Sequence, residues 1–165
     1  MENTLPATQK NGFPENNPDL LGTIAQQNGN KSGKQLSTVD IIRQDAQRNG
    51  LNPDQILQTI AKLKLSSQNV QTIKIGNTVF LLMRTPPSKV EVHTFTVDKP
   101  NVMVSNFKNL IKFLKKAGIK QGFTYSEEPI FKQLVERSGM PVQITQTIKQ
   151  IGNEMKPVYQ YTMDL

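Results

Sequence analysis

The sequence predicts an α+β fold: a mixed, mostly antiparallel β-sheet with helices on its faces, preceded by an extended N-terminal arm. Three observations support this prediction. Some segments repeat apolar residues at helical spacing, whereas others alternate or run continuously, as strands do. Two Gly-Asn pairs, at residues 76–77 and 152–153, each lie between apolar runs, which is a hairpin signal. Strand–helix–strand units follow the first hairpin, and this order favours a mixed sheet with helices packed on it.

Residues 1–36 form the predicted arm, and residues 37–165 form the predicted domain. The arm is rich in Asn, Gln, Gly, Pro and Ser, so it cannot bury enough apolar surface to offset the entropy of ordering it. We therefore expect a partner subunit to hold the arm. Its sizeable apolar side chains are the expected partner-binding residues: Phe13, Leu20, Leu21 and Ile24.

The domain begins with two predicted helices. Ser37 offers a hydroxyl N-cap for the first, which ends at the Asn-Gly pair of residues 49–50. Asn52 caps the second, and a proline at the next position suits the first turn of a helix. Apolar residues at helical spacing give the second helix one apolar face: Ile56, Leu57, Ile60 and Leu63.

A three-stranded antiparallel meander is predicted next. A strand ending at Ile75 leads into the first Gly-Asn turn, and a third strand runs from Lys89 to Val97. Between them, residues 79–83 (VFLLM) form an unbroken apolar run. Because a strand with one solvated face would alternate, this run suggests a strand covered on both faces.

The C-terminal part adds two helices and three strands. A helix follows the Asp-Lys-Pro-Asn turn at residues 98–101 and ends at Gly118. A short strand covers residues 122–125, and a helix capped at Ser126–Pro129 runs to about Ser138. Residues 142–151 and 158–163 then form a hairpin around the second Gly-Asn turn.

Composition excludes several kinds of chemistry. The chain has no cysteine, and its single histidine leaves no ligand set for a structural zinc. No stretch approaches the roughly 18 apolar residues that a membrane helix needs.

The formal net charge is +7, and residues 36–99 and 100–165 contribute +3 and +4 of it. A basic domain suits nucleic acid or an acidic protein surface, although a solvated lysine surface explains the charge as well.

From residue 38 to residue 165, the order of elements resembles the GNAT family, the GCN5-related acetyltransferases. In that family two early helices precede an antiparallel meander, a helix follows the fourth strand, and a strand–helix–strand–strand unit completes the sheet. The family's first strand, which would precede the helices, is not found here. Residues 90–96 (VEVHTFT), the lysine-rich helix leading to residues 117–120 and the ending from residue 139 look like small GNAT-like proteins of tailed bacteriophages.

This resemblance implies where acetyl-CoA would bind. The family holds the pyrophosphate at the start of the helix after the fourth strand, with the pattern Gln/Arg-x-x-Gly-x-Gly/Ala. Glycine lets the backbone approach the anion, and the helix dipole favours negative charge. The corresponding residues 97–104 (VDKPNVMV) contain no glycine; Pro100 lacks an N–H, and Asp98 adds negative charge. We therefore expect a degenerate domain without a cofactor, a metal or catalytic residues.

Four residues could still serve an acyltransferase. Glu91 and His93 share one face of their strand, in the neighbourhood where a GNAT general base often lies. Tyr159 or Tyr161 could supply an acid from the last strand. Packing explains the same residues, because tyrosines are common in half-buried strands and His93 could be a cross-strand or interface residue. The sequence favours packing.

Two patterns could bind nucleic acid. The helix pair around Gly50 could be a helix-turn-helix with these cations near phosphates: Arg43, Arg48, Lys62 and Lys64. The later amphipathic helix carries a lysine face that could meet an acidic partner or nucleic acid: Lys108, Lys112, Lys115 and Lys116. A solvated surface is the simpler explanation of this lysine face.

One main prediction and two alternatives follow. The main prediction is a structural, non-enzymatic component of a tailed-phage virion, made in the host cytoplasm and resident in the particle. Its arm would fasten an acetyltransferase-like scaffold to capsid or to portal and neck subunits, in a multi-copy assembly without a membrane partner. The first alternative is an acetyl-CoA-dependent N-acyltransferase. The second is a nucleic-acid-binding module.

Overall fold

The computed structural model describes residues 34–165. The predicted anchors Phe13, Leu20, Leu21 and Ile24 lie outside the described residues. The described elements, in chain order, are α2 (Thr38–Arg48), α3 (Pro53–Ser66), β1 (Val70–Ile75), β2 (Thr78–Thr85), β3 (Lys89–Thr96), α4 (Pro100–Lys116), β4 (Gln121–Ser126), α5 (Pro129–Arg137), β5 (Gln143–Ile151) and β6 (Glu154–Asp164).

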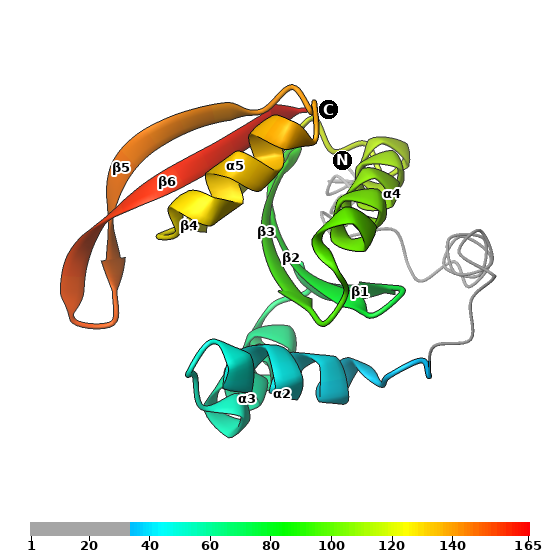
Figure 1. The fold of residues 1–165 in the computed structure, drawn as a ribbon, viewed down its shortest axis with the longest axis vertical. Coiled ribbons are helices and arrows are strands. Elements are labelled where there is room, and N and C mark those ends of the chain that lie inside the picture. Colours follow the sequence, from blue (N-terminus) through cyan, green and yellow to red (C-terminus); the bar gives the residue numbers. More distant parts are fainter. Residues whose placement is uncertain (1–33) are drawn as a thin grey trace, which may run out of the picture.

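All six strands belong to one sheet, in the order β1-β2-β3-β4-β6-β5. Every neighbouring pair is antiparallel except β3 and β4, which run parallel. Figure 1 shows α2 and α3 together on one side of the β1–β3 meander and α4 on the other, with α5 alongside the β5–β6 hairpin. The predicted fold class is confirmed. No strand precedes α2 within residues 34–165, so the family's first strand has no counterpart there.

The helices begin where their capping residues predict. The Ser37 hydroxyl accepts a hydrogen bond from the Asp40 amide at 3.1 Å and caps α2. The Asn52 side chain accepts from the amides of Asp54 and Gln55, at 3.0 and 3.2 Å, and caps α3. Such caps satisfy amides that have no acceptor inside the helix, so these short polar residues fix where the two helices start.

Strand β2 is buried on both faces, as its unbroken apolar run predicts. Phe80 and Leu82 pack against α4 residues such as Leu110 in one core cluster. Val79 and Leu81 pack against Ile41, Ile42 and Ile60 of α2 and α3 in a second cluster on the opposite face. The meander is thus the middle layer of a three-layer arrangement, and its position is fixed from both sides.

The parallel seam between β3 and β4 is short. Pairing covers only Lys89 with Gln121, Val90 with Gly122 and Glu91 with Phe123. Beyond Glu91, β3 continues along β2 to Thr96, while β4 continues along β6 to Ser126. The two strands therefore diverge, and the sheet opens after Glu91.

Candidate functional site

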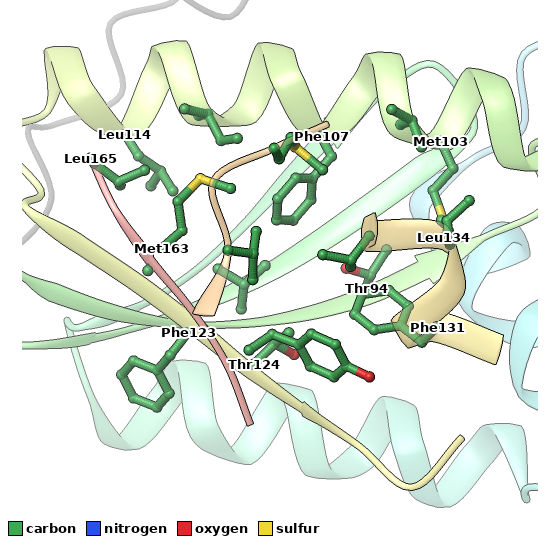
Figure 2. Close-up of a pocket in the computed structure, with 18 residues that line it drawn as sticks. Thr94, Met103, Phe107, Leu114, Phe123, Thr124, Phe131, Leu134, Met163 and Leu165 are labelled. Atoms are coloured by element: carbon green, nitrogen blue, oxygen red, sulfur yellow. The ribbon is translucent and has the colours of Figure 1, made fainter. Parts of the chain in front are cut away.

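An apolar pocket lies where β3 and β4 diverge. Its walls come from β3, α4, β4, α5, the segment that follows α5 and β6, and its volume is about 60 Å³. In Figure 2, Met103, Phe107 and Leu114 point down from α4, with Phe131 and Leu134 of α5 at one end and Leu165 at the other. The lining is almost entirely apolar, so the pocket suits the hydrocarbon part of a ligand better than a charged group.

Tyr161 is one of the hydroxyl-bearing residues that line the pocket, together with Thr94 and Thr124. The residue is only 3% exposed, and its hydroxyl has no hydrogen-bond partner among the described residues. Its ring meets the Phe131 ring edge to face, with centroids 4.8 Å apart. Burial, with smaller contributions from Tyr159 and Glu136, raises the pKa of the Tyr161 hydroxyl. The hydroxyl therefore keeps its proton at neutral pH and can donate a hydrogen bond to a ligand.

A charged cluster lies beside the same opening, on the other face of the sheet. His93 Nε2 lies 3.0 Å from Glu91 Oε1, and Lys149 Nζ of β5 lies 3.2 Å from the same oxygen. The Lys149 ammonium also stands over the Tyr125 ring, 3.7 Å from its centroid. The hydrogen bond from His93 lowers the pKa of Glu91, and the positive charge of Lys149 adds to this, whereas burial opposes it. The carboxyl is therefore ionised at neutral pH and can accept a hydrogen bond from an amine.

The sequence favours a packing role for four residues: Glu91, His93, Tyr159 and Tyr161. The structure places them in different surroundings. Glu91 and His93 are joined by a hydrogen bond at the opening. Tyr161 lines the pocket, and Tyr159 does not. Sequence reasoning missed Lys149 and Tyr125. Lys149 is 58 positions from Glu91, and no local signal shows that the β5–β6 hairpin reaches across to β3.

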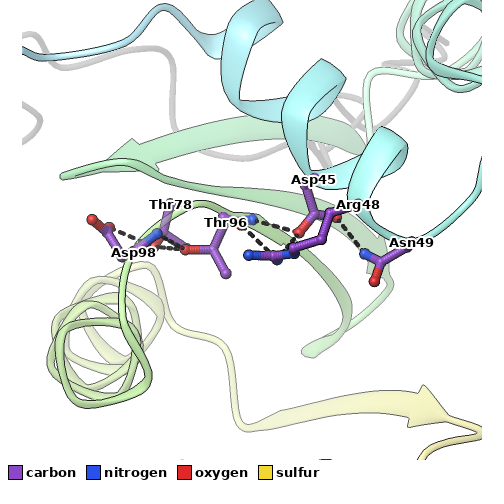
Figure 3. Close-up of polar contacts among 6 residues, drawn as sticks. All are labelled: Asp45, Arg48, Asn49, Thr78, Thr96 and Asp98. Carbon is purple, nitrogen blue, oxygen red and sulfur yellow. Dashed lines mark hydrogen bonds and ion pairs between the residues drawn. The ribbon is translucent and has the colours of Figure 1, made fainter.

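A polar network fixes the corner where β3 leads into α4 (Figure 3). Asp45 of α2 accepts from the Thr96 amide at 3.2 Å and pairs with Arg48 at 2.7 Å. The Thr96 hydroxyl lies 2.8 Å from the Thr78 hydroxyl, which donates to Asp98 at 3.0 Å. These contacts join α2, β2 and β3, so they set the direction in which the chain enters α4.

The start of α4 differs in one respect from the sequence-based interpretation. Asp98 Oδ2 accepts hydrogen bonds from the Asn77 amide at 3.0 Å and from the Asn106 amide group at 2.9 Å. Its charge is therefore engaged by the β1–β2 turn. Lys99 is the N-cap without a side-chain cap bond, and Pro100 follows it. The first amides of a helix have no acceptor within it, so this end of α4 carries partial positive charge. It offers one hydrogen-bond donor fewer than usual, because Pro100 has no N–H.

The predicted cationic surfaces are only partly free. The four lysines Lys108, Lys112, Lys115 and Lys116 are exposed along α4. In the suggested helix-turn-helix, Arg43 pairs with Asp54 at 3.2 Å and Arg48 pairs with Asp45. Nucleic-acid binding and partner binding at these positions stay predictions, as do the phage partners and the place in a particle.

Neither a metal site nor a membrane-spanning helix is found between residues 34 and 165. No group of His, Cys, Asp and Glu side chains there could hold a metal ion. No helix in the same range is long and apolar enough to cross a membrane.

Comparison with solved structures identifies the fold as GNAT-like. A probable acetyltransferase from Staphylococcus epidermidis matches with a TM-score of 0.50 and 13% identity, over 92% of this chain and 95% of that one. A probable GNAT-family acetyltransferase from Chromobacterium violaceum matches with 0.51 and 10%, over 68% of each chain. The protein yncA of Salmonella typhimurium, named as an acetyltransferase and solved with its cofactor acetyl-CoA, matches with 0.50 and 9%, over 79% and 91%. No family model and no curated protein matches the sequence.

These likenesses contradict the prediction that the protein is not an enzyme. The solved structures that share its fold are named as acetyltransferases, and one of them holds acetyl-CoA. The prediction treated three features of residues 97–104 as a loss of activity: the absence of glycine, the donor that Pro100 lacks and the charge of Asp98. Those residues would contact the pyrophosphate, and Met103 and Val104 among them also line the apolar pocket, whereas the opening and the Glu91–His93 pair lie elsewhere in the fold.

Proposed function

We propose that the protein is an N-acyltransferase that moves an acyl group from a thioester of the acetyl-CoA type to a primary amine. The observation that carries this proposal is the opening after Glu91. An apolar pocket lies on one of its faces and an ionised carboxylate with a neighbouring histidine lies on the other. A thioester and an amine could therefore approach each other from opposite faces. The acetyltransferase names of proteins with the same fold support this reading.

The residues fit one end of acetyl-CoA better than the other. The apolar pocket suits the acyl group and the thioester arm, and the Tyr161 hydroxyl offers a donor inside it. At the start of α4, the Lys99 ammonium and the helix dipole attract a diphosphate. No glycine lets the backbone come close there, and Pro100 lacks a donor. We therefore expect the thioester arm to supply most of the binding free energy.

Two groups of the chain would move protons. The Glu91 carboxylate accepts a proton from the amine, and His93 holds that carboxylate ionised through its hydrogen bond. The Tyr161 hydroxyl, which burial keeps protonated, donates to the sulfur that leaves. When bound, the thioester supplies an activated acyl carbon. The apolar walls exclude water and thereby limit hydrolysis.

The test compares two donors, acetyl-CoA and S-acetyl-N-acetylcysteamine, which keeps the thioester arm and lacks the diphosphate. A donor at about ten times its Kd stabilises the folded chain by about 1.4 kcal/mol, which raises Tm by about 5 °C for a domain of about 130 residues. Transfer to small primary amines releases a thiol, and a thiol reagent detects it without background because the chain has no cysteine.

Glu91→Gln keeps the shape of the side chain and removes the proton acceptor, so thiol release should fall about 100-fold or more. Glu154→Gln is the matched control, since Glu154 is 75% exposed and lies at the tip of the β5–β6 hairpin. Absence of a Tm shift and of thiol release with both donors would refute the proposed function.

A further inference from the structure

The ammonium of Lys149 is held at the opening of the sheet. Lys149 Nζ donates to Glu91 Oε1 at 3.2 Å and stands 3.7 Å from the centroid of the Tyr125 ring. Its side chain is 38% exposed, while that of Glu91 is 18% exposed. Two different interactions, an ion pair and a cation–π contact, thus fix a primary amine beside a largely buried carboxylate.

The amine and the apolar pocket lie on opposite faces of the sheet at the same opening. Glu91 is the last residue of β3 that pairs with β4, and Phe123 is its partner. Both Phe123 and Val92, the residue after Glu91, line the pocket. The Lys149 amine therefore occupies the position that the amine acceptor takes under the proposed function, with a proton acceptor already within hydrogen-bond distance.

We propose that Lys149 is itself an acyl acceptor, modified within its own chain by the thioester that binds in the pocket. This inference rests on the proposed function. A new C–N bond forms between Lys149 Nζ and the acyl carbon, and the C–S bond of the thioester breaks. The ammonium loses two protons through Glu91 to solvent, and the sulfur leaves as a thiol with a proton from the Tyr161 hydroxyl, which solvent restores. Ammonium and thioester thus give an amide, a thiol and one proton.

Acylation changes the electrostatics of the opening. The amide carries no positive charge, so the ion pair with Glu91 and the cation–π contact with Tyr125 are both lost. Of its two neighbours at Oε1, Glu91 then keeps only His93. The modified chain presents to an external amine a carboxylate without the ammonium of Lys149, which makes the modification a step that opens the acceptor side.

Lys156 is a matched internal control. The hairpin register places Lys156 directly opposite Lys149, and its side chain is 40% exposed, close to the 38% of Lys149. It also lies near carboxylates, 3.7 Å from Glu154 and 3.9 Å from Glu127. Uncatalysed acylation should therefore affect the two lysines similarly. A difference in rate reports on the surroundings of Glu91.

The experiment incubates the full chain with S-acetyl-N-acetylcysteamine or acetyl-CoA and follows acetylation of both lysines over time. Mass spectrometry after digestion with a protease that does not cut at lysine gives the occupancy of each site. We expect Lys149 to be acetylated at least about 10-fold faster than Lys156. In Glu91→Gln the two rates should become equal. Lys149→Arg should abolish the fast phase, and its Tm identifies any folding defect.

Equal rates at Lys149 and Lys156, or an unchanged ratio in Glu91→Gln, would overturn the inference. Thiol release with small amines separates the two claims. Release without preferential acetylation of Lys149 refutes the inference and leaves the proposed function standing. Absence of release, of a Tm shift and of a rate difference refutes both.

Discussion

Replacing Tyr161 with phenylalanine tests the pocket through stability as well as activity. The substitution removes a hydroxyl that is buried without a hydrogen-bond partner, and it keeps the ring that meets Phe131 edge to face. An unsatisfied buried polar group costs about 1–3 kcal/mol, so its removal should raise the free energy of unfolding by about 1 kcal/mol. With an unfolding entropy of about 2.1 cal/mol/K per residue, a domain of about 130 residues gains about 4 °C in Tm.

The same variant should lose activity. If the hydroxyl donates a proton to the leaving sulfur, thiol release should fall about 100-fold while the stability rises. Thermal and urea unfolding give the first quantity, and the thiol assay gives the second. Tyr159→Phe is the control, because Tyr159 lies on the same strand and does not line the pocket. A lower Tm, or an unchanged rate of thiol release, would refute the reasoning.

Three further predictions concern Glu91, the glycines of the two hairpin turns and Asp45. The folded-state pKa of Glu91 lies below its ordinary value of 4.5, so its contribution to stability is present above that pH and disappears as the pH falls through the folded-state pKa. Urea titrations below pH 5 should accordingly show a shallower loss of stability in Glu91→Gln than in the wild type, and parallel curves would contradict the cited shift. Gly76→Ala should destabilise by clearly more than Gly152→Ala. Both have positive φ (59° and 63°), which costs about 1–2 kcal/mol, but only at Gly76 would the new Cβ lie 3.2 Å from the Asn106 side chain; equal midpoints of urea unfolding would disprove the steric difference. Asp45→Ala should lower the free energy of unfolding by about 2 kcal/mol, since it leaves the buried Thr96 amide without its acceptor, and a loss below 0.5 kcal/mol on the same assay would show that water replaces it.

Local signals predicted most of the fold. Ser37 and Asn52 cap helices by hydrogen bonds that involve residues two or three positions away, so the sequence contains everything those helix starts require. The apolar run of β2 likewise predicts burial on both faces, because no solvated face interrupts it. Such features depend on residues that are close together along the chain, so they can be predicted from the sequence.

The candidate site depends instead on distant contacts. The opening exists because pairing between β3 and β4 stops at Glu91, and no residue there marks the end of pairing. Lys149 reaches Glu91 only through the course of the β5–β6 hairpin. From the sequence alone, the negative charge of Asp98 beside a helix start suggests that it repels an anion there. In the structure its carboxylate instead accepts hydrogen bonds from Asn77 and Asn106.

The short seam between β3 and β4 also has a consequence for motion. Three residue pairs join the meander to the β4–β6 half of the sheet, whereas β5 and β6 pair over nine. Regions joined by few backbone hydrogen bonds separate at a lower free energy than the regions on either side of them. The β1–β3 meander and the β4–β6 part of the sheet can therefore separate transiently along the seam while the hydrogen bonds of β2 stay formed. Amide hydrogens along the seam would then exchange with solvent sooner than those of β2, and the width of the opening would fluctuate without unfolding either core.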